Sequence, residues 1–77
     1  MKNMILERVI KLPWYKRLLT LRKVFNLTQE EVAKRCGTTQ KTYWNWENGI
    51  HYPSKYYRKL LAKIYNLNVQ SIFTKER

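Results

Sequence analysis

Acidic residues, cysteine and histidine are all scarce in this chain of 77 residues. It has no aspartate, five glutamates, one cysteine (Cys36) and one histidine (His51). A single cysteine cannot form an internal disulfide, and with one histidine it offers no set of metal ligands at usable spacing. Adjacent carboxylates occur only at Glu30 and Glu31, on a solvated first turn, and there is no glycine-rich phosphate loop. We therefore expect a non-enzyme with no catalytic residues, no metal and no cofactor.

Long apolar stretches are also missing. No run approaches the roughly 20 residues that span a bilayer. The first six residues are too short, and too soon followed by Glu7 and Arg8, to serve as a signal peptide. We therefore expect a cytoplasmic protein without a membrane partner, whose lone thiol stays reduced.

Positive charge, by contrast, is abundant. Sixteen lysines and arginines give the chain a formal net charge of +11. Such an excess favours a polyanionic partner, either nucleic acid or an anionic membrane surface, although an ordinary solvated basic surface is the alternative. The length suits one small domain with a single modest core.

Two glycines and two prolines mark the boundaries of the expected elements. Thr28, followed three residues later by Glu31, forms a capping box that starts a helix, and Gly37 suits the left-handed turn that ends it. The sequence predicts an all-α compact bundle of four to five short helices, residues 14–77, after an N-terminal extension, residues 1–13. Within the extension, residues 4–12 suit either a short helix or a strand. The other helices are expected at about 14–25, 28–37, 39–49, 54–66 and 68–73, with Ser54 and Asn68 as the caps of the last two.

Residues 28–49 have the layout of a helix-turn-helix, two short helices around one tight turn. On the second helix Tyr43, Trp46 and Ile50 point one way, towards the core. The opposite face carries Gln40, Lys41, Trp44 and Asn45. A purely structural helical hairpin would have the same spacing, but it would not explain polar side chains on the outward face. The pattern therefore favours a helix that reads the DNA major groove.

The same residues carry a resemblance to a known family. Leu27–Ala33, Gly37, Trp46–Gly49 and Pro53–Ser54 make residues 17–73 resemble the phage repressor and Cro proteins, the XRE-type helix-turn-helix family. The resemblance implies a compact five-helix domain like that of lambda repressor. It also implies a sequence-specific transcriptional regulator, usually a repressor, that binds double-stranded operator DNA as a homodimer and needs no cofactor.

Roles for individual residues follow from the resemblance. Gln40 would be the main base reader, since an amide pairs with adenine N6 and N7 together. Lys41 would reach a guanine or a phosphate, and Asn45 a base edge. A buried Arg22–Glu47 ion pair would be structural. The residues expected at phosphates are Thr28, Gln29, Thr39, Thr42, Asn48, Lys55 and Lys59.

Two positions on the second helix depart from the family pattern. Tyr43 is larger than the aliphatic residue usual at its place, so we expect a slight adjustment of the helix packing. Trp44 puts an indole among the base-reading residues. Four readings stay open for it: contact with a sugar, contact with a thymine methyl, a protein interface, or an indole lying flat on Lys41.

The helix expected at 54–66 also departs from the family. Lys55 and Arg58 stand where leucines are common, which makes a dimer interface there doubtful. With Lys59 and Lys63 they form a basic stripe, suited either to phosphate attraction or to plain solvation.

A second function class is a protein-interaction module on the same fold, an antitoxin or adaptor. It would bind a partner protein through Trp44 and the extension. We expect the extension to pack on its own domain, although exchange between protomers and binding to another protein are alternatives. A third class, a cationic membrane-surface peptide, is disfavoured by the helix caps and the aromatic core.

Overall fold

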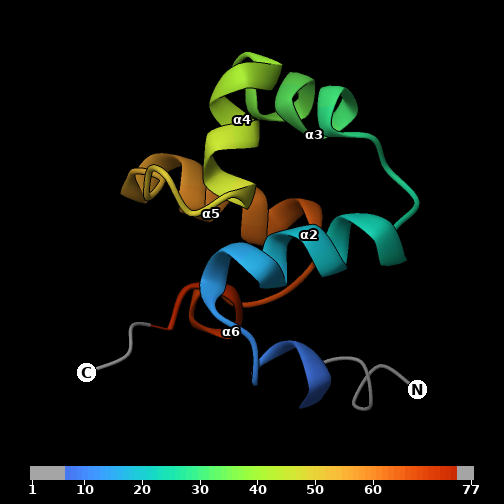
Figure 1. Ribbon diagram of the computed structural model, residues 1–77, viewed down its shortest axis with the longest axis vertical. Helices are drawn as coiled ribbons and strands as arrows, with labels where there is room; N and C mark the ends of the chain where they lie inside the picture. Colours follow the sequence, from blue (N-terminus) through green and yellow to red (C-terminus); the bar gives the residue numbers. More distant parts are fainter. Residues whose placement is uncertain (1–6, 75–77) are drawn as a thin grey trace.

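Residues 7–74, the part of the chain that the computed structural model describes, contain five helices, a further helical turn at residues 7–9 and no strand. The helices are α2 (Trp14–Val24), α3 (Gln29–Cys36), α4 (Gln40–Glu47), α5 (Lys55–Ile64) and α6 (Val69–Phe73). The prediction of an all-α bundle is therefore confirmed (Figure 1). Residues 4–6 of the predicted helix or strand lie outside the described residues.

Local side-chain chemistry sets the helix ends. At the start of α3, Thr28 Oγ1 accepts from Glu31 N at 3.0 Å, and Thr28 N donates to Glu31 Oε1 at 2.8 Å, which is the predicted capping box. Gly37 ends α3 with φ of 73°, a left-handed conformation that costs glycine little. The prediction for Asn68 is wrong in one respect: it stands at the start of α6, but its side chain makes no capping hydrogen bond.

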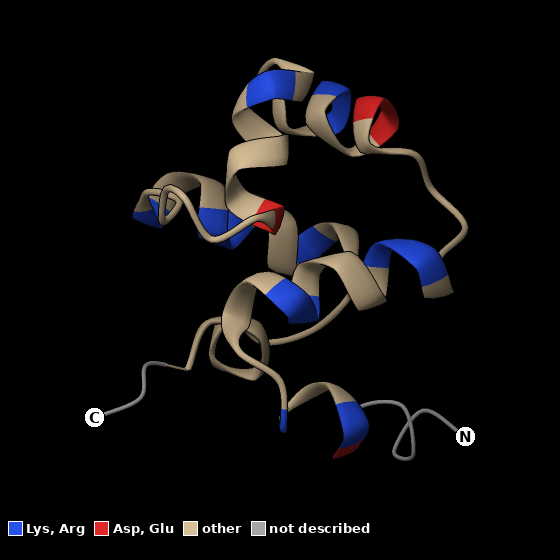
Figure 2. Ribbon diagram, in the orientation of Figure 1, with Lys and Arg blue, Asp and Glu red and all other residues tan. Residues whose placement is uncertain are grey.

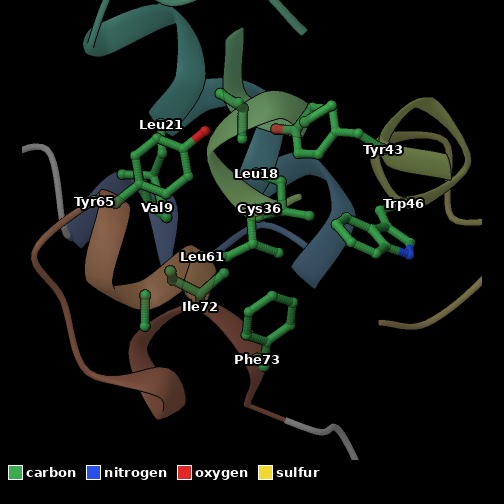
Figure 3. Close-up of a cluster of buried hydrophobic side chains, with 13 residues drawn as sticks. Val9, Leu18, Leu21, Cys36, Tyr43, Trp46, Leu61, Tyr65, Ile72 and Phe73 are labelled. Carbon is green, nitrogen blue, oxygen red and sulfur yellow. The ribbon is translucent and has the colours of Figure 1, made fainter. Parts of the chain in front are cut away.

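The helices pack around one core (Figure 3). Helix α4 contacts α3 and α2, α5 contacts α3, and α6 contacts both α2 and α5. The predicted packing residues of the helix-turn-helix, Val32, Ala33, Tyr43 and Trp46, are all buried. The prediction that Ile50 packs with them is wrong, because its side chain is 54% exposed. Gly49, with φ of 70°, turns the chain off the helical path before that residue, so the wheel no longer applies.

The core contains two buried tyrosines, Tyr43, which was predicted to pack, and Tyr65, for which no prediction was made. Tyr43 and Tyr65 are both fully buried, and their hydroxyl groups point towards each other in Figure 3. Burial raises the pKa of both hydroxyls, that of Tyr65 to about 12, so both stay neutral at physiological pH. The larger side chain at position 43 is therefore accommodated inside the core, opposite a second phenol.

Arg17 is a buried cation that joins the two ends of the described chain. Its side chain donates to Leu12 O at 2.6 Å and to Ile10 O at 2.7 Å. It also donates to Ser71 O at 3.1 Å and Ile72 O at 3.4 Å, both within α6. Only 3% of the residue is exposed, so these carbonyl groups take the place of water around the guanidinium.

The N-terminal segment is therefore attached to the helical body. Val9 is fully buried in the core, and the two carbonyl bonds of Arg17 hold the residues just before α2. The division of the chain into residues 1–13 and 14–77 stays a prediction.

The core also contains the Arg22–Glu47 ion pair expected between α2 and the end of α4. Arg22 Nε lies 2.6 Å from Glu47 Oε2, and Arg22 Nη2 donates to Glu47 Oε1 at 3.2 Å. Arg22 Nη1 donates to Leu27 O at 2.9 Å, which ties the turn after α2 to the same guanidinium. The side chains are 13% and 3% exposed, so each charge depends on the other for solvation. The hydrogen bond that Arg22 donates to Glu47 raises the pKa of Arg22, which keeps the pair ionised.

We predict that Arg17→Met destabilises the protein by about 2–4 kcal/mol, because it leaves buried carbonyl groups without a donor. The measurement is the free energy of unfolding from urea titration. Lys16→Met is the matched control, since Lys16 is the exposed neighbour of Arg17. Equal losses of unfolding free energy in the two variants would contradict the view that the Arg17 hydrogen bonds stabilise the fold.

We predict that Arg22→Met costs about 3–5 kcal/mol, because the Glu47 carboxylate stays buried without its cation. The double variant Arg22→Met/Glu47→Met recovers a large part of that loss, since no unpaired charge remains. Urea titration measures both, with Lys23→Met, an exposed site on the same helix, as the control. A double variant less stable than Arg22→Met would refute this account.

Candidate nucleic-acid interface

Helices α3 and α4 project together from the body formed by α2, α5 and α6 (Figure 1). Gly37 makes the turn between them, and Ala33, 2% exposed, lets them approach closely. The first turn of α4 lies at the outer end, whereas its last turn, at Glu47, reaches the body. This is the geometry of a helix-turn-helix that presents the start of its second helix to a partner.

The outward face of α4 carries the side chains predicted to read bases. Gln40, Lys41 and Trp44 line a shallow hollow in the surface. All three are exposed, Trp44 by 41%. Asn45, next along the helix, is half-buried, and its main-chain carbonyl accepts from Ile50 N at 2.9 Å. The structure thus brings three of the four predicted readers together at one surface, with Asn45 set back beside them.

A hydrogen-bonded chain connects this surface to the buried ion pair. Gln29 Nε2 donates to Glu47 Oε1 at 3.0 Å, and Gln29 Oε1 accepts from Gln40 Nε2 at 3.5 Å. Gln29 therefore joins the ion pair to the first residue of α4. Gln29 is predicted from the sequence to contact a phosphate. Neither of its side-chain contacts could be predicted, because they depend on how closely α3 and α4 approach.

The other polar residues predicted at phosphates make local bonds. Thr28 caps α3 as described, and Thr39 Oγ1 accepts from Thr42 N at 3.1 Å and donates to Thr42 Oγ1 at 2.9 Å. Asn48 Nδ2 donates to Trp44 O at 2.8 Å and closes the end of α4. These side chains shape both helix ends at the surface, and they keep oxygen or nitrogen atoms exposed.

Charge is distributed unevenly around this surface (Figure 2). Lys41 on α4 is exposed, and so are Lys55 and Lys59 on α5. Glu30 and Glu31, however, lie in the first turn of α3. The backbone N–H of Thr28 lowers the pKa of Glu31, so this carboxylate stays ionised beside Thr28 and Gln29. An anion at the start of α3 would meet this negative charge.

The predicted basic stripe on α5 is correct only in part. Arg58 is half-buried, donates to Pro53 O at 2.7 Å and lies 5.0 Å over the ring of Tyr52. Its guanidinium is therefore packed against the turn before α5. Lys55, Lys59 and Lys63 are the exposed cations of that helix.

Metal-binding side chains do not gather in the described part of the chain. Among residues 7–74, no three histidine, cysteine or acidic side chains are placed to hold a metal ion. Burial raises the pKa of the Cys36 thiol to about 11, which leaves little thiolate at neutral pH. No helix within the same residues is both long and apolar enough to cross a membrane.

Comparison with known proteins identifies the family. A family model described as a helix-turn-helix domain matches residues 15–76. The chain is 37% identical over 57 residues to an uncharacterized HTH-type transcriptional regulator of Archaeoglobus fulgidus, a match that covers 74% of this chain and 80% of that protein. It is 33% identical over 60 residues to another such regulator from Methanocaldococcus jannaschii, with 78% of this chain and 91% of that protein covered.

No solved structure matches the chain. The family match nevertheless spans most of its length and includes α3, the glycine turn and α4. The chain therefore belongs to the XRE-type helix-turn-helix family that its sequence resembles.

Proposed function

We propose that this protein is a transcriptional regulator, acting as a repressor, that reads a specific double-stranded DNA sequence through residues 39–48. The observation that carries the proposal is the exposed face of α4, on which Gln40, Lys41 and Trp44 stand together. The matched relatives are named as HTH-type transcriptional regulators, which supports the same class of function. The protein acts by binding alone, without catalysis or cofactor.

Gln40 is the principal reader. Its contact with Gln29 uses one hydrogen of its amide nitrogen and leaves the other hydrogen and the amide oxygen free. These two atoms suit adenine, whose N7 accepts and whose N6 donates in the major groove. Gln29, held by Glu47, orients the Gln40 amide before DNA arrives. Lys41 donates to a guanine, and Asn45 reaches a base edge one turn along the helix.

Phosphate contacts hold α4 in register. We assign them to Thr28, Gln29, Thr39, Thr42, Asn48, Lys55 and Lys59. The amide of Gln29 is engaged inside the protein, so its free main-chain N–H at the start of α3 is the better donor to a phosphate. A homodimer on a two-fold symmetric operator would place two copies of α4 one helical turn of DNA apart.

We predict that selection from random duplexes yields a defined DNA sequence, and that Gln40→Ala weakens binding to it by about 1–3 kcal/mol. This loss corresponds to roughly 5- to 150-fold in the dissociation constant. Gln70→Ala, an exposed glutamine on α6, is the matched control and retains full affinity. For the parent protein and for both variants, the binding constant falls as salt rises. The fall is about 0.9 log units per log unit of salt for each phosphate neutralised.

Two results would refute the proposal. One is a selection in which no sequence is enriched. The other is a Gln40→Ala variant with the same sequence preference as the parent protein. The symmetry of the selected sequence also tests the homodimer, because a two-fold reader requires a palindrome.

The second candidate function is a protein-interaction module, an antitoxin or adaptor, favoured by the exposed indole of Trp44. Under this function α4 would contact another protein. The selection experiment separates the two candidates, because a protein-binding surface has no reason to enrich one DNA sequence.

A further inference from the structure

Trp44 is the one tryptophan of the chain that is exposed. Trp14 packs edge-on against Tyr52, with ring centroids 5.0 Å apart, and Trp46 is 3% exposed beside Tyr43. Trp44 is 41% exposed, and within residues 7–74 its indole has neither an aromatic neighbour nor a cation over its face. Contact of the indole with the stem of Lys41 stays a prediction.

The indole belongs to a shaped surface. Gln40 and Lys41 precede Trp44 by four and three residues, so all three lie on one side of α4. Long helical side chains lean towards the N-terminus, which directs the Trp44 ring back over the first turn of the helix. These three residues line one shallow, mostly apolar hollow. The bond from Asn48 Nδ2 to Trp44 O holds this part of the helix in place.

Few chemical groups in the DNA major groove fit an apolar hollow on a base-reading helix. The major-groove edges of the bases present hydrogen-bond donors and acceptors, and their one apolar group is the 5-methyl of a pyrimidine. An indole face makes few favourable interactions with water. When a methyl group packs on it, the apolar surfaces of both groups are removed from water.

We infer that Trp44, with the stems of Gln40 and Lys41, is a specificity site for the 5-methyl group of a pyrimidine next to the base pair that Gln40 reads. Thymine and 5-methylcytosine both carry this group. The inference rests on the proposed function, and it assigns to Trp44 a sequence preference that hydrogen bonding does not supply.

The test uses the full chain and the duplex obtained by selection. Each thymine is replaced singly by deoxyuridine, which removes one methyl group and keeps every hydrogen-bonding atom. Binding weakens about fourfold at one or two positions, as expected for one buried carbon, and is unchanged elsewhere. Trp44→Ala binds the thymine and deoxyuridine duplexes equally, whereas Gln40→Ala retains part of the discrimination.

A second set of duplexes identifies the source of the methyl group. Each cytosine is replaced singly by 5-methylcytosine. If thymine is the natural ligand, no cytosine methylation strengthens binding. If 5-methylcytosine is the ligand, binding strengthens about fourfold at one position, and Trp44→Ala abolishes the gain. Tyr56→Ala, which removes a more exposed aromatic ring from α5, leaves every difference intact.

The inference is overturned if no methyl group on either pyrimidine affects binding, or if Trp44→Ala keeps the same discrimination as the parent protein. Trp44→Gln is a second variant with a polar side chain, and circular dichroism reports whether each variant is folded. Failure here leaves the proposed function intact, since a selected sequence and a Gln40→Ala effect remain. Failure of the selection itself removes both.

Discussion

The helix-turn-helix depends on the buried contact between Arg22 and Glu47. Arg22 belongs to α2, and Glu47 is the last residue of α4, so their two hydrogen bonds set where α4 leaves the body. The carboxylate of Glu47 also accepts from Gln29, the first residue of α3. One carboxylate thereby positions both helices of the motif. A buried charge tolerates few alternative arrangements of its partners. This contact therefore favours a single position of α4 relative to α2.

The consequences extend to the surface. Gln29 Oε1 accepts from Gln40 Nε2, and Gln40 lines the same hollow as Trp44. A side chain that must meet a base edge benefits from being oriented before binding, since less freedom is lost on association. The outward face of α4 thus combines the Gln40 amide, which is hydrogen-bonded to Gln29, with the exposed indole of Trp44.

A second buried cation supports the opposite side of the molecule. Arg17 donates hydrogen bonds to main-chain carbonyls of the segment before α2 and of α6, two regions far apart in the sequence. Such carbonyls would otherwise be buried without donors, at a cost that a small core cannot easily offset. Arg17 therefore closes the body on which α3 and α4 stand.

Much of the helical framework could be predicted because its signals are local. The capping box at Thr28 and the left-handed turn at Gly37 act within a few positions of the chain, and both are observed. The helical wheel predicted Tyr43 and Trp46 correctly. It was wrong for Ile50 because Gly49 ends the helical path, and a wheel describes only a continuing helix.

Arg17 could have been found, since it lies on the apolar stripe of α2 beside Leu18 and Leu21. No role was predicted for this residue. The Gln29 contacts could not be found in this way. They require the distance between two helices, which no spacing along the chain contains.

The sequence by itself determined the fold class, most helix ends and the residues on the outward face of α4, because these depend on periodicity and capping chemistry. The resemblance of its motifs indicated the family. Only the tertiary structure decided which polar groups are already engaged: Arg58 with the turn before α5, and Gln29 between Glu47 and Gln40. It also decided that Trp44 is 41% exposed, with no aromatic ring and no cation over its indole within residues 7–74. Burial and hydrogen bonding are properties of neighbours in space, and those neighbours come from separate helices.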